Sequence, residues 1–308
     1  MKQNILITGG AGFIGSNLAD KLLELSHNVI VIDNLSSGSK KNLDKRIKFY
    51  KMDICDAKIV KVFAKENIDI VFHLAAQINV RDSVKDPIAD AKTNILGSLN
   101  ILENCRNFNV KKVIFSSSGG TIYGDAKIIP TSENSPEIPE SPYGIAKLSV
   151  EKYLNYYFKS FGLNFVVLRL ANVYGPRQNP KGEAGVVAIF TDKMLAKKEV
   201  VINGSGGQTR DYVFVDDVVL ACKMAMESSK TGIFNVGTGV ETDVNFIFSE
   251  IKKSTNSECK EIHGPENIGE LQRSCLDFSK IKTTFSWQPK YDFKSGLAKT
   301  INWFKKKI

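Results

Sequence analysis

The sequence of 308 residues is poor in the residues that bind metals or form cross-links. Its five cysteines are odd in number, widely spaced and include no C-x-x-C pair, and its three histidines are equally scattered. This argues against a disulfide framework or a protein-ligated zinc ion and favours cysteines that act as small core residues in a reducing compartment. No apolar run approaches the roughly 18 residues of a membrane span, and the start leaves no room for a signal peptide. We therefore expect a cytoplasmic protein with no metal site.

The composition, 43% hydrophobic and 24% charged, is that of an ordinary globular protein. The formal net charge of +9 comes mostly from lysines spread along the chain, and the densest run is residues 305–307. Nucleic-acid binding would require a basic patch interleaved with aromatic residues or a helix-turn-helix pattern, and the sequence has neither. The lysines therefore indicate a solvated surface, whose mild positive field also suits an anionic small substrate.

A glycine-rich turn follows the first predicted strand and precedes a helical pattern. Gly9 permits a tight turn, Gly12 lets the backbone approach a pyrophosphate, and Gly15 lets the helix pack on its strand. The second predicted strand ends in Asp33, 18 residues after Gly15. A carboxylate at this position bonds a ribose 2′-hydroxyl and repels a 2′-phosphate, which favours NAD over NADP. The turn thus predicts a dinucleotide site.

Strand and helix patterns alternate along the first 170 residues. Strands are expected at 4–8, 28–32, 47–50, 69–74, 111–117 and 164–170, and helices near 56–66, 87–107 and 142–160. This alternation predicts a doubly wound parallel sheet of the α/β class, which binds ligands beyond the carboxyl ends of its strands. The candidate residues at these ends are Asp53, the segments 74–77 and 116–118, and Asn172. Asp53 is alternatively a helix N-cap, and His73 is interpreted as a hydrogen-bonded core histidine.

Beyond residue 172 the alternation breaks. We expect a helix near 186–197, strands at 200–202 and 233–237, a strand from 210 that leads into a helix at 217–227, and amphipathic helices near 243–254 and 293–306. The expected division is a dinucleotide-binding domain of residues 1–172 and 211–237, and a second, smaller α/β domain of residues 173–210 and 238–308.

Tyr143 and Lys147 are four residues apart on the first turns of a predicted helix, which puts the phenol and the ammonium on one face. Ser141 is a natural N-cap and Pro142 fits the first helical position. A cation near a phenol favours the phenolate and lowers the tyrosine pKa, which makes the tyrosine a usable base near neutral pH. Alone the spacing is a weak signal; beside a dinucleotide turn it indicates an active site.

Ten motifs, spread nearly end to end, carry a resemblance to a known family. They are residues 8–16, 33–35, 53–54, 73–77, 115–118, 123–124, 141–147, 172–177, 210–212 and 234–237. With them the chain resembles the extended short-chain dehydrogenase/reductase family, with its Rossmann-type fold, and within it the UDP-glucose 4-epimerase type. Such enzymes take the sugar 4-hydroxyl proton on a tyrosine while hydride passes from C4 to NAD, and then return the hydride to the other face of the 4-keto sugar.

The resemblance implies a role for each matching residue. Tyr143 would be the base, Lys147 would bind the nicotinamide ribose, and Ser118 would hydrogen-bond the reacting hydroxyl. The implied NAD site comprises Gly9, Gly12, Phe13, Ile14, Gly15, Asp33, Asn34, Asp53, Ile54, Leu74, Ala75, Ala76, Gln77, Asn94, Ser116, Tyr143 and Lys147. The implied UDP-sugar site comprises Ser118, Thr121, Tyr143, Asn172, Val186, Val201, Arg210, Glu270 and Ser274.

Three departures from the family pattern bear on the reaction. One extra residue before Tyr123 leaves Ser118 or Thr121 as the hydroxyl partner, and Ser118 is preferred. Asn267 stands where the family usually has an arginine, which puts one phosphate contact in doubt. Ser274 is small at the position that limits the sugar pocket, which suggests room for a 2-acetamido group.

Other functions on the same scaffold remain alternatives. A 4,6-dehydratase would carry an Asp-Glu pair where this chain has Gly119 and Gly120, which argues against elimination chemistry. A uronate 4-epimerase or decarboxylase would need an extra cation, for which Arg81 or Arg177 is a candidate. A non-catalytic NAD sensor would not need the tyrosine and lysine. The resemblance also implies a homodimer, formed through the helices at 87–107 and 142–160.

Overall fold

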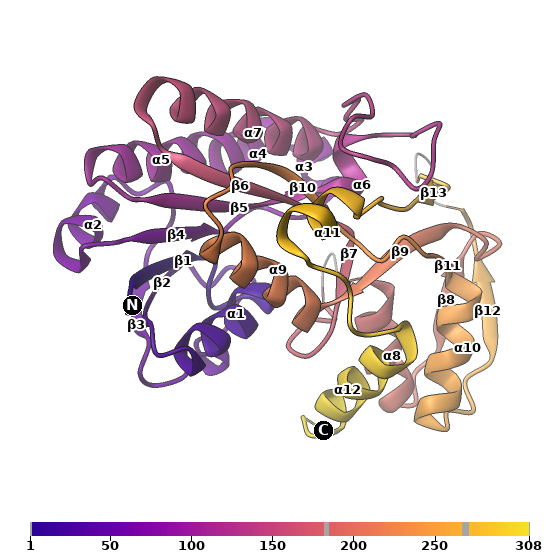
Figure 1. Cartoon of the computed structure of the whole chain (residues 1–308). Helices are drawn as coiled ribbons and strands as arrows, with labels where there is room; N and C mark the ends of the chain where they lie inside the picture. The colour runs from indigo at the N-terminus through magenta and orange to yellow at the C-terminus, as the bar shows by residue number, and fades with distance from the viewer. Residues whose placement is uncertain (1, 182–184, 267–270, 308) are drawn as a thin grey trace.

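A seven-stranded parallel sheet forms the larger part of the computed structural model, which describes residues 2–181, 185–266 and 271–307 (Figure 1). The strands lie in the order β3-β2-β1-β4-β5-β6-β10. Their bounds are β1 Asn4–Thr8, β2 Asn28–Asp33, β3 Lys48–Lys51, β4 Ile70–His73, β5 Lys112–Ser118, β6 Asn164–Leu170 and β10 Gly232–Val236. The strand order reverses between β1 and β4, so loops at the carboxyl ends of these two strands diverge and leave space for a ligand.

Helices cover both faces of this sheet because its strands are apolar on both sides. One face is covered by α1 (Phe13–Glu24), α9 (Val215–Glu227) and α11 (Ser279–Phe285), and the other by α2 (Val60–Glu66), α5 (Gly97–Asn107) and α7 (Pro142–Phe161). The shorter helical segments are α3 (Val80–Lys85), α4 (Pro87–Ala91), the π-helical turn η3 (Lys92–Leu96), α6 (Gly119–Ile122), η1 (Lys40–Asn42) and η2 (Ala57–Ile59). The doubly wound α/β class is therefore confirmed.

A smaller lobe lies beyond one end of the sheet (Figure 1). Its first sheet joins β7 (Asn172–Tyr174), β9 (Thr209–Phe214), β11 (Glu241–Asp243) and β13 (Arg273–Ser274), and its second pairs β8 (Val200–Asn203) with β12 (Glu261–Gly264). The helices α8 (Val186–Leu195), α10 (Val244–Thr255) and α12 (Phe293–Lys305) pack there around a core of their own. β9 belongs to this lobe, so the expected boundary at residue 211 runs through a strand.

The single long helix expected at 87–107 is three consecutive segments, α4, η3 and α5. Across the described ranges, no helix is long and apolar enough to cross a membrane. The same part of the chain contains no cluster of three or more residues able to hold a metal ion. All five cysteines are described and free, with Cys105, Cys222 and Cys275 buried.

Candidate active site

The glycine turn after β1 forms a cradle that side chains would fill. Gly9 has φ +70°, and a Cβ on it would lie 2.7 Å from the backbone nitrogen of Ala75. A Cβ on Gly15 would lie 2.4 Å from the carbonyl oxygen of Gly9. Gly12 is the N-cap of α1, and no side chain in the described structure caps this helix, so its first N–H groups are available to an anion. The cradle fits a pyrophosphate.

Asp33, at the end of β2, accepts hydrogen bonds from the backbone of the glycine turn and of the loop that follows β2. Its Oδ2 accepts a 2.9 Å hydrogen bond from the Ala11 N–H in the glycine turn, and its Oδ1 accepts one of 2.7 Å from the Leu35 N–H. The carboxylate is 8% exposed. Because each carboxylate oxygen has a further lone pair, Asp33 retains acceptor capacity for a ribose hydroxyl. Sequence reasoning did not identify Ala11, because only its backbone takes part.

Asn34 and Asp53 lie beside each other at the ends of β2 and β3. The Asn34 amide donates to Asp53 Oδ2 at 2.8 Å, and the Cys55 N–H donates to Asp53 Oδ1 at 2.9 Å. Burial acts to raise the pKa of Asp53, but these hydrogen bonds outweigh it and lower the pKa. Ile54, next in the chain, is buried. The alternative expectation of Asp53 as a helix N-cap is wrong, because the N-cap of the following η2 is Asp56; Asp53 accepts from the Cys55 N–H and pairs with Asn34 instead.

The loop after β4 is held by buried side chains. His73 Nε2 lies 2.8 Å from Ser98 Oγ and Nδ1 lies 2.7 Å from Thr8 Oγ1. Ser98 donates its proton to the Asn94 carbonyl, so Nε2 is the donating nitrogen and Nδ1 accepts from Thr8. Burial, with a smaller contribution from Lys147, lowers the pKa of His73 to about 3. His73 is therefore a hydrogen-bonded core histidine, as expected.

Asn94 pairs with the backbone of Gln77 in both directions. Its Oδ1 accepts from the Gln77 N–H and its Nδ2 donates to the Gln77 carbonyl, each at 2.9 Å. This pair fixes the loop that contains Leu74, Ala75 and Ala76 against the π-helical turn η3. Asp90 on α4 joins the same network, although no sequence signal pointed to it.

Helix α7 begins as the sequence predicts. Ser141 Oγ accepts a 3.1 Å hydrogen bond from the Gly144 N–H, and Pro142 occupies the first turn. The Tyr143 N–H donates to Ser83 Oγ on α3 at 3.2 Å. Lys147 is 3% exposed, its Nζ donates to the Ser116 carbonyl at 2.9 Å, and Nζ lies 5.7 Å from the centre of the Tyr143 ring. The helix thus brings the phenol, the ammonium and the end of β5 together.

The expected lowering of the tyrosine pKa is wrong for the protein groups alone. Burial, followed by the negative charge of Asp90, raises the pKa of Tyr143 above its usual value. Burial also lowers the pKa of Lys147 to about 8, against the opposing effect of Asp90 and Glu151. The spacing of Tyr143 and Lys147 predicted their common face, but desolvation and a carboxylate from another helix determine their protonation.

The segment that follows β5 packs against the C-terminal lobe. Ser118 ends β5, and Thr121 lies in α6 with its Oγ1 buried and without a hydrogen-bond partner among the described residues. A Cβ on Gly120 would lie 3.7 Å from Ser274 Oγ. A Cβ on Gly119 would lie 2.5 Å from Leu276 Cδ1. Ser274 therefore lies beside the segment that carries both candidate hydroxyls.

Four further predicted substrate residues lie in the smaller lobe or at its border: Asn172 on β7, Val186 at the start of α8, Val201 on β8 and Arg210 on β9. Arg210 donates to the Thr209 carbonyl at 2.8 Å. Glu270 and Asn267 lie outside the described residues. Of the two candidate uronate cations, Arg177 is paired with Asp20 on α1 at 2.5 Å, and Arg81 is exposed on α3.

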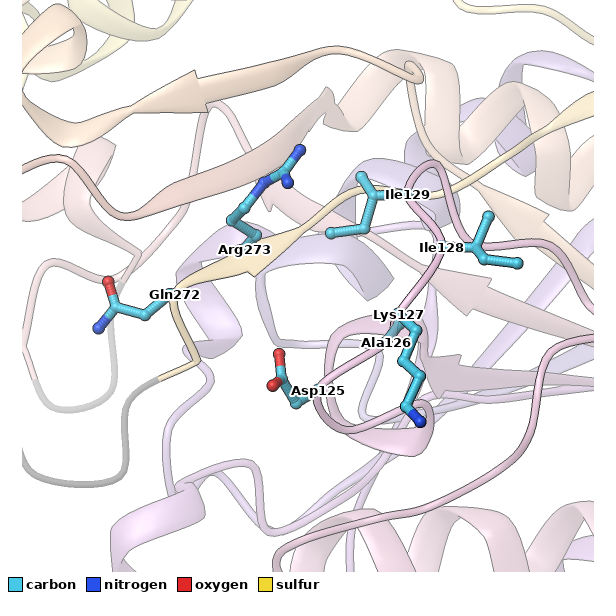
Figure 2. A pocket seen from close by; sticks show the side chains of 7 residues that line it. All are labelled: Asp125, Ala126, Lys127, Ile128, Ile129, Gln272 and Arg273. Atoms are coloured by element: carbon cyan, nitrogen blue, oxygen red, sulfur yellow. The ribbon is translucent and has the colours of Figure 1, made fainter.

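A cavity of about 440 Å³ lies between the loop 125–129 and the strand β13 (Figure 2). Its described lining is Asp125, Ala126, Lys127, Ile128, Ile129, Gln272 and Arg273. Arg273 is paired with Glu241 on β11 at 2.5 Å. The cavity adjoins Ser274 along the chain and was not expected from the sequence, because the two segments that line it are about 145 residues apart and carry no motif.

Three comparisons with known proteins agree with this geometry. The model of the NAD dependent epimerase/dehydratase family matches residues 5–237. A UDP-glucose 4-epimerase of Mycolicibacterium smegmatis is 44% identical over 308 residues, covering 98% of each chain. A solved UDP-glucose 4-epimerase of Thermotoga maritima with UDP-glucose is 50% identical, with a TM-score of 0.97 over 99% of both chains.

A UDP-N-acetylglucosamine 4-epimerase of Methanobrevibacter ruminantium, solved with UDP-N-acetylmuramic acid, is 37% identical, with a TM-score of 0.95 over 100% of both chains. The glycine cradle, Asp33 and the Tyr143–Lys147 helix define a nucleotide-binding α/β protein with the side chains of a dehydrogenase. The chain belongs to the NAD dependent epimerase/dehydratase family.

Proposed function

We propose that this protein is an NAD-dependent 4-epimerase of UDP-hexoses that interconverts UDP-glucose and UDP-galactose, and that it also accepts the 2-acetamido sugars. The observation that carries the proposal is the meeting of Tyr143 and Lys147 on one face of α7, beside the carboxyl ends of β4 and β5. The family match and the UDP-glucose 4-epimerase relatives support the reaction. Fold alone would not be sufficient.

The cofactor is NAD, and the proposed residues hold it in three groups. The cradle of Gly9, Gly12 and Gly15, with the first turn of α1, takes the pyrophosphate. Asp33 takes the adenosine ribose. The remaining proposed contacts line the strand ends: Phe13, Ile14, Asn34, Asp53, Ile54, Leu74, Ala75, Ala76, Gln77, Asn94, Ser116, Tyr143 and Lys147. When bound, NAD would supply reversible hydride transfer at the sugar and the positive charge of its oxidised ring.

The protein contributes proton transfer and positioning. Tyr143 removes the proton from the sugar 4-hydroxyl and later returns it, so the same group acts as base and acid. Lys147, held by the Ser116 carbonyl, binds the nicotinamide ribose and contributes a positive charge near the phenol. Because burial and Asp90 raise the tyrosine pKa even with Lys147 beside the ring, the compensating positive charge is assigned to the bound cofactor.

The UDP group is assigned to the smaller lobe. We propose that Asn172 and Arg210 bind the diphosphate, Val186 and Val201 the base, and Glu270 the ribose. Arginine suits a diphosphate because its planar fork makes paired charge-assisted hydrogen bonds.

Ser274 is proposed to border the sugar. Its Oγ lies close to Gly120 and its side chain is short, which leaves space for a 2-acetamido group. The UDP-N-acetylglucosamine 4-epimerase among the similar structures supports this extension.

Gly119 weighs against the dehydratase alternative. Elimination needs an acid and a base after the hydroxyl residue, but a side chain at position 119 would collide with Leu276, which is 1% exposed. Of the two cations that the uronate alternative could use, Arg177 pairs with Asp20 on α1 through Nη2, and Arg81 is exposed on α3.

We also propose a domain division, an oligomeric state and a location for the whole chain. Residues 1–172 and 211–237 are proposed as the NAD domain, and 173–210 and 238–308 as the substrate domain. The pairing of β10 with β6 and the separate core around α8, α10 and α12 favour this division, except that β9 lies in the smaller lobe. The chain forms a homodimer through α4, η3, α5 and α7. It is cytoplasmic, which its five free thiols favour.

The decisive experiment uses purified protein without added NAD. It is incubated separately with UDP-galactose and with UDP-N-acetylgalactosamine, and the 4-epimers are resolved by chromatography or proton NMR. Conversion of UDP-galactose is expected because the cofactor is regenerated in each cycle and can stay bound. The ratio of the two rates tests the role of Ser274. If neither sugar converts even with NAD added, the proposed function is wrong.

A further inference from the structure

Asp90 is a buried carboxylate whose two oxygens differ in their hydrogen bonds. Its side chain is 1% exposed on α4. Oδ1 accepts hydrogen bonds of 2.9 Å from Gln77 Nε2 and from Asn94 Nδ2. Oδ2 is buried and has no hydrogen-bond partner within the described ranges. Burying a carboxylate with an unpaired oxygen is costly, so its presence beside the site calls for a function.

The position of Asp90 is fixed by the π-helical turn that follows it. Asn94 lies in this turn and holds the loop after β4 through Gln77 in both directions. Turns of this kind within helices are frequently found at functional sites. The carboxylate is therefore anchored to the same loop that the NAD proposal uses.

The charge of Asp90 acts on the two reacting groups. Helix α4 packs against α7, and the negative charge raises the pKa of Tyr143 and of Lys147. Burial raises the pKa of Asp90 itself, while Lys147 opposes that rise. The other buried titratable groups that share an interaction with Lys147 are Glu151 and His73. The charged side chains of the neighbouring α3 and η3 are exposed, namely Arg81, Asp82, Lys85 and Lys92.

We propose that Asp90 is a positioning residue that sets the protonation of the Tyr143–Lys147 pair. Its carboxylate supplies the negative charge that keeps the buried ammonium protonated. The same charge balances the cations beside the phenol, so that the tyrosine can return the proton as well as take it. This inference rests on the proposed epimerase function.

The chemistry explains why such a balance is useful. Burial alone would let Lys147 lose its proton near neutral pH, because it lowers the pKa to about 8 even with Asp90 present. An epimerase also needs one group to act as base and as acid in a single cycle, which favours a pKa near the working pH. The negative charge of Asp90 raises the pKa of both Tyr143 and Lys147, so it moves both proton-loss steps to higher pH.

The test compares Asp90→Asn, Asp90→Ala and the control Asp82→Asn in the NAD-containing enzyme. Asp82 lies on α3 and is exposed, so its substitution removes the same charge from the surface. Both Asp90 variants should shift both limbs of the kcat/KM pH profile to lower pH by about one unit. The tyrosinate absorbance that depends on Tyr143, obtained by subtracting the spectrum of the same protein with Tyr143→Phe, should appear at lower pH. Asp82→Asn should change neither.

The absorbance titration needs no turnover, so it remains readable even if the protein lacks epimerase activity. An unchanged titration and profile in both Asp90 variants would overturn the proposal. A change in Asp90→Ala alone would also overturn it, because asparagine keeps the Oδ1 acceptor and the effect would then come from the hydrogen bonds. If both neutral variants fail to fold, the carboxylate serves structure and the proposal is equally refuted.

Discussion

In the proposed mechanism Tyr143 exchanges a proton with a sugar hydroxyl, yet its surroundings favour the protonated phenol. Burial and Asp90 both raise its pKa. Lys147 lies 5.7 Å from the ring centre, and the positive charge proposed to act against them is that of the oxidised cofactor. In this proposal the reactivity of Tyr143 depends on bound NAD. A variant that lacks the phenol but retains NAD therefore tests the role of the tyrosine separately from that of the cofactor.

Tyr143→Phe should retain NAD and the fold but lower turnover by about 10²- to 10⁴-fold, because the base is removed while the cradle is untouched. Turnover is measured with UDP-galactose, and bound NAD by its release on denaturation. Near-normal turnover in this variant would contradict the assigned mechanism.

Ser118 and Thr121 offer two hydroxyls for one role. Thr121 Oγ1 is buried without a described hydrogen-bond partner. Ser118 is the last residue of β5, at the carboxyl end of the sheet, where the substrate is expected. With Ser118 as the partner, Ser118→Ala should lower kcat by about 10- to 100-fold and Thr121→Val by less than about threefold, since one hydrogen bond to a developing charge is lost. The opposite ranking in steady-state kinetics would assign the role to Thr121.

At the scale of the element, α7 and β6 are joined behind the site by a buried ion pair. Arg169 and Glu151 are each 1% exposed, their closest charged atoms are 2.6 Å apart, and Arg169 also pairs with Glu137. Glu151 Oε1 further accepts a 2.6 Å hydrogen bond from Ser117, the neighbour of Ser116 and Ser118. This network fixes α7 relative to the strand that ends at the site.

Glu151→Gln should lower the free energy of unfolding by about 3 kcal/mol, because it leaves the buried Arg169 charge with the partly exposed Glu137 as its remaining described carboxylate partner. The matched control is Lys152→Ala at the next position, which removes an ion pair whose lysine is 63% exposed and should cost less than about 1 kcal/mol. Urea unfolding of the two variants measures the difference. Equal costs would mean that the buried pair contributes no more than the surface one.

Helices and strands that show a local hydrophobic or capping pattern could be predicted from the sequence. Elements that form only because distant segments pair could not. The apolar runs at 4–8 and 164–170 and the cap of α7 were visible locally. β13 has two residues and exists because it pairs with β9. The π-helical turn and Asp90 left no signal, since a single aspartate on a short helix resembles any solvated residue.

At the scale of the whole molecule, His73 links stability to pH. Burial lowers its pKa to about 3, below the roughly 6.5 of an unfolded histidine, so the unfolded chain binds the extra proton. Stability should therefore fall as pH drops below about 6.5, by about 2 kcal/mol from this residue at pH 5. His73→Asn should reduce this loss in urea unfolding at pH 7 and pH 5. His263→Gln, on the surface, should leave the loss in place.

Exposed apolar side chains on α4, η3 and α7 support the proposed dimer. Ile88 is 80% exposed, Leu96 59% and Tyr156 53%. The double variant Ile88→Glu, Tyr156→Glu should weaken association by about 100-fold or more, because charges would be buried in the interface. Sedimentation equilibrium measures it, with Val240→Glu as a control at a 60% exposed site outside these helices. A monomeric wild-type protein would contradict the proposal directly.

The position of residues 275–277, which follow β13, has a consequence for how the protein is made. The Thr131 N–H donates to the Cys275 carbonyl at 2.8 Å, the Asp277 N–H donates to the Thr131 carbonyl at 2.9 Å, and Leu276 packs on Gly119. A ribosome completes the glycine cradle and the Tyr143–Lys147 helix long before it reaches residue 276. The nascent chain therefore contains the residues proposed to hold the cofactor before Ser274, which is proposed to border the sugar, has been synthesised.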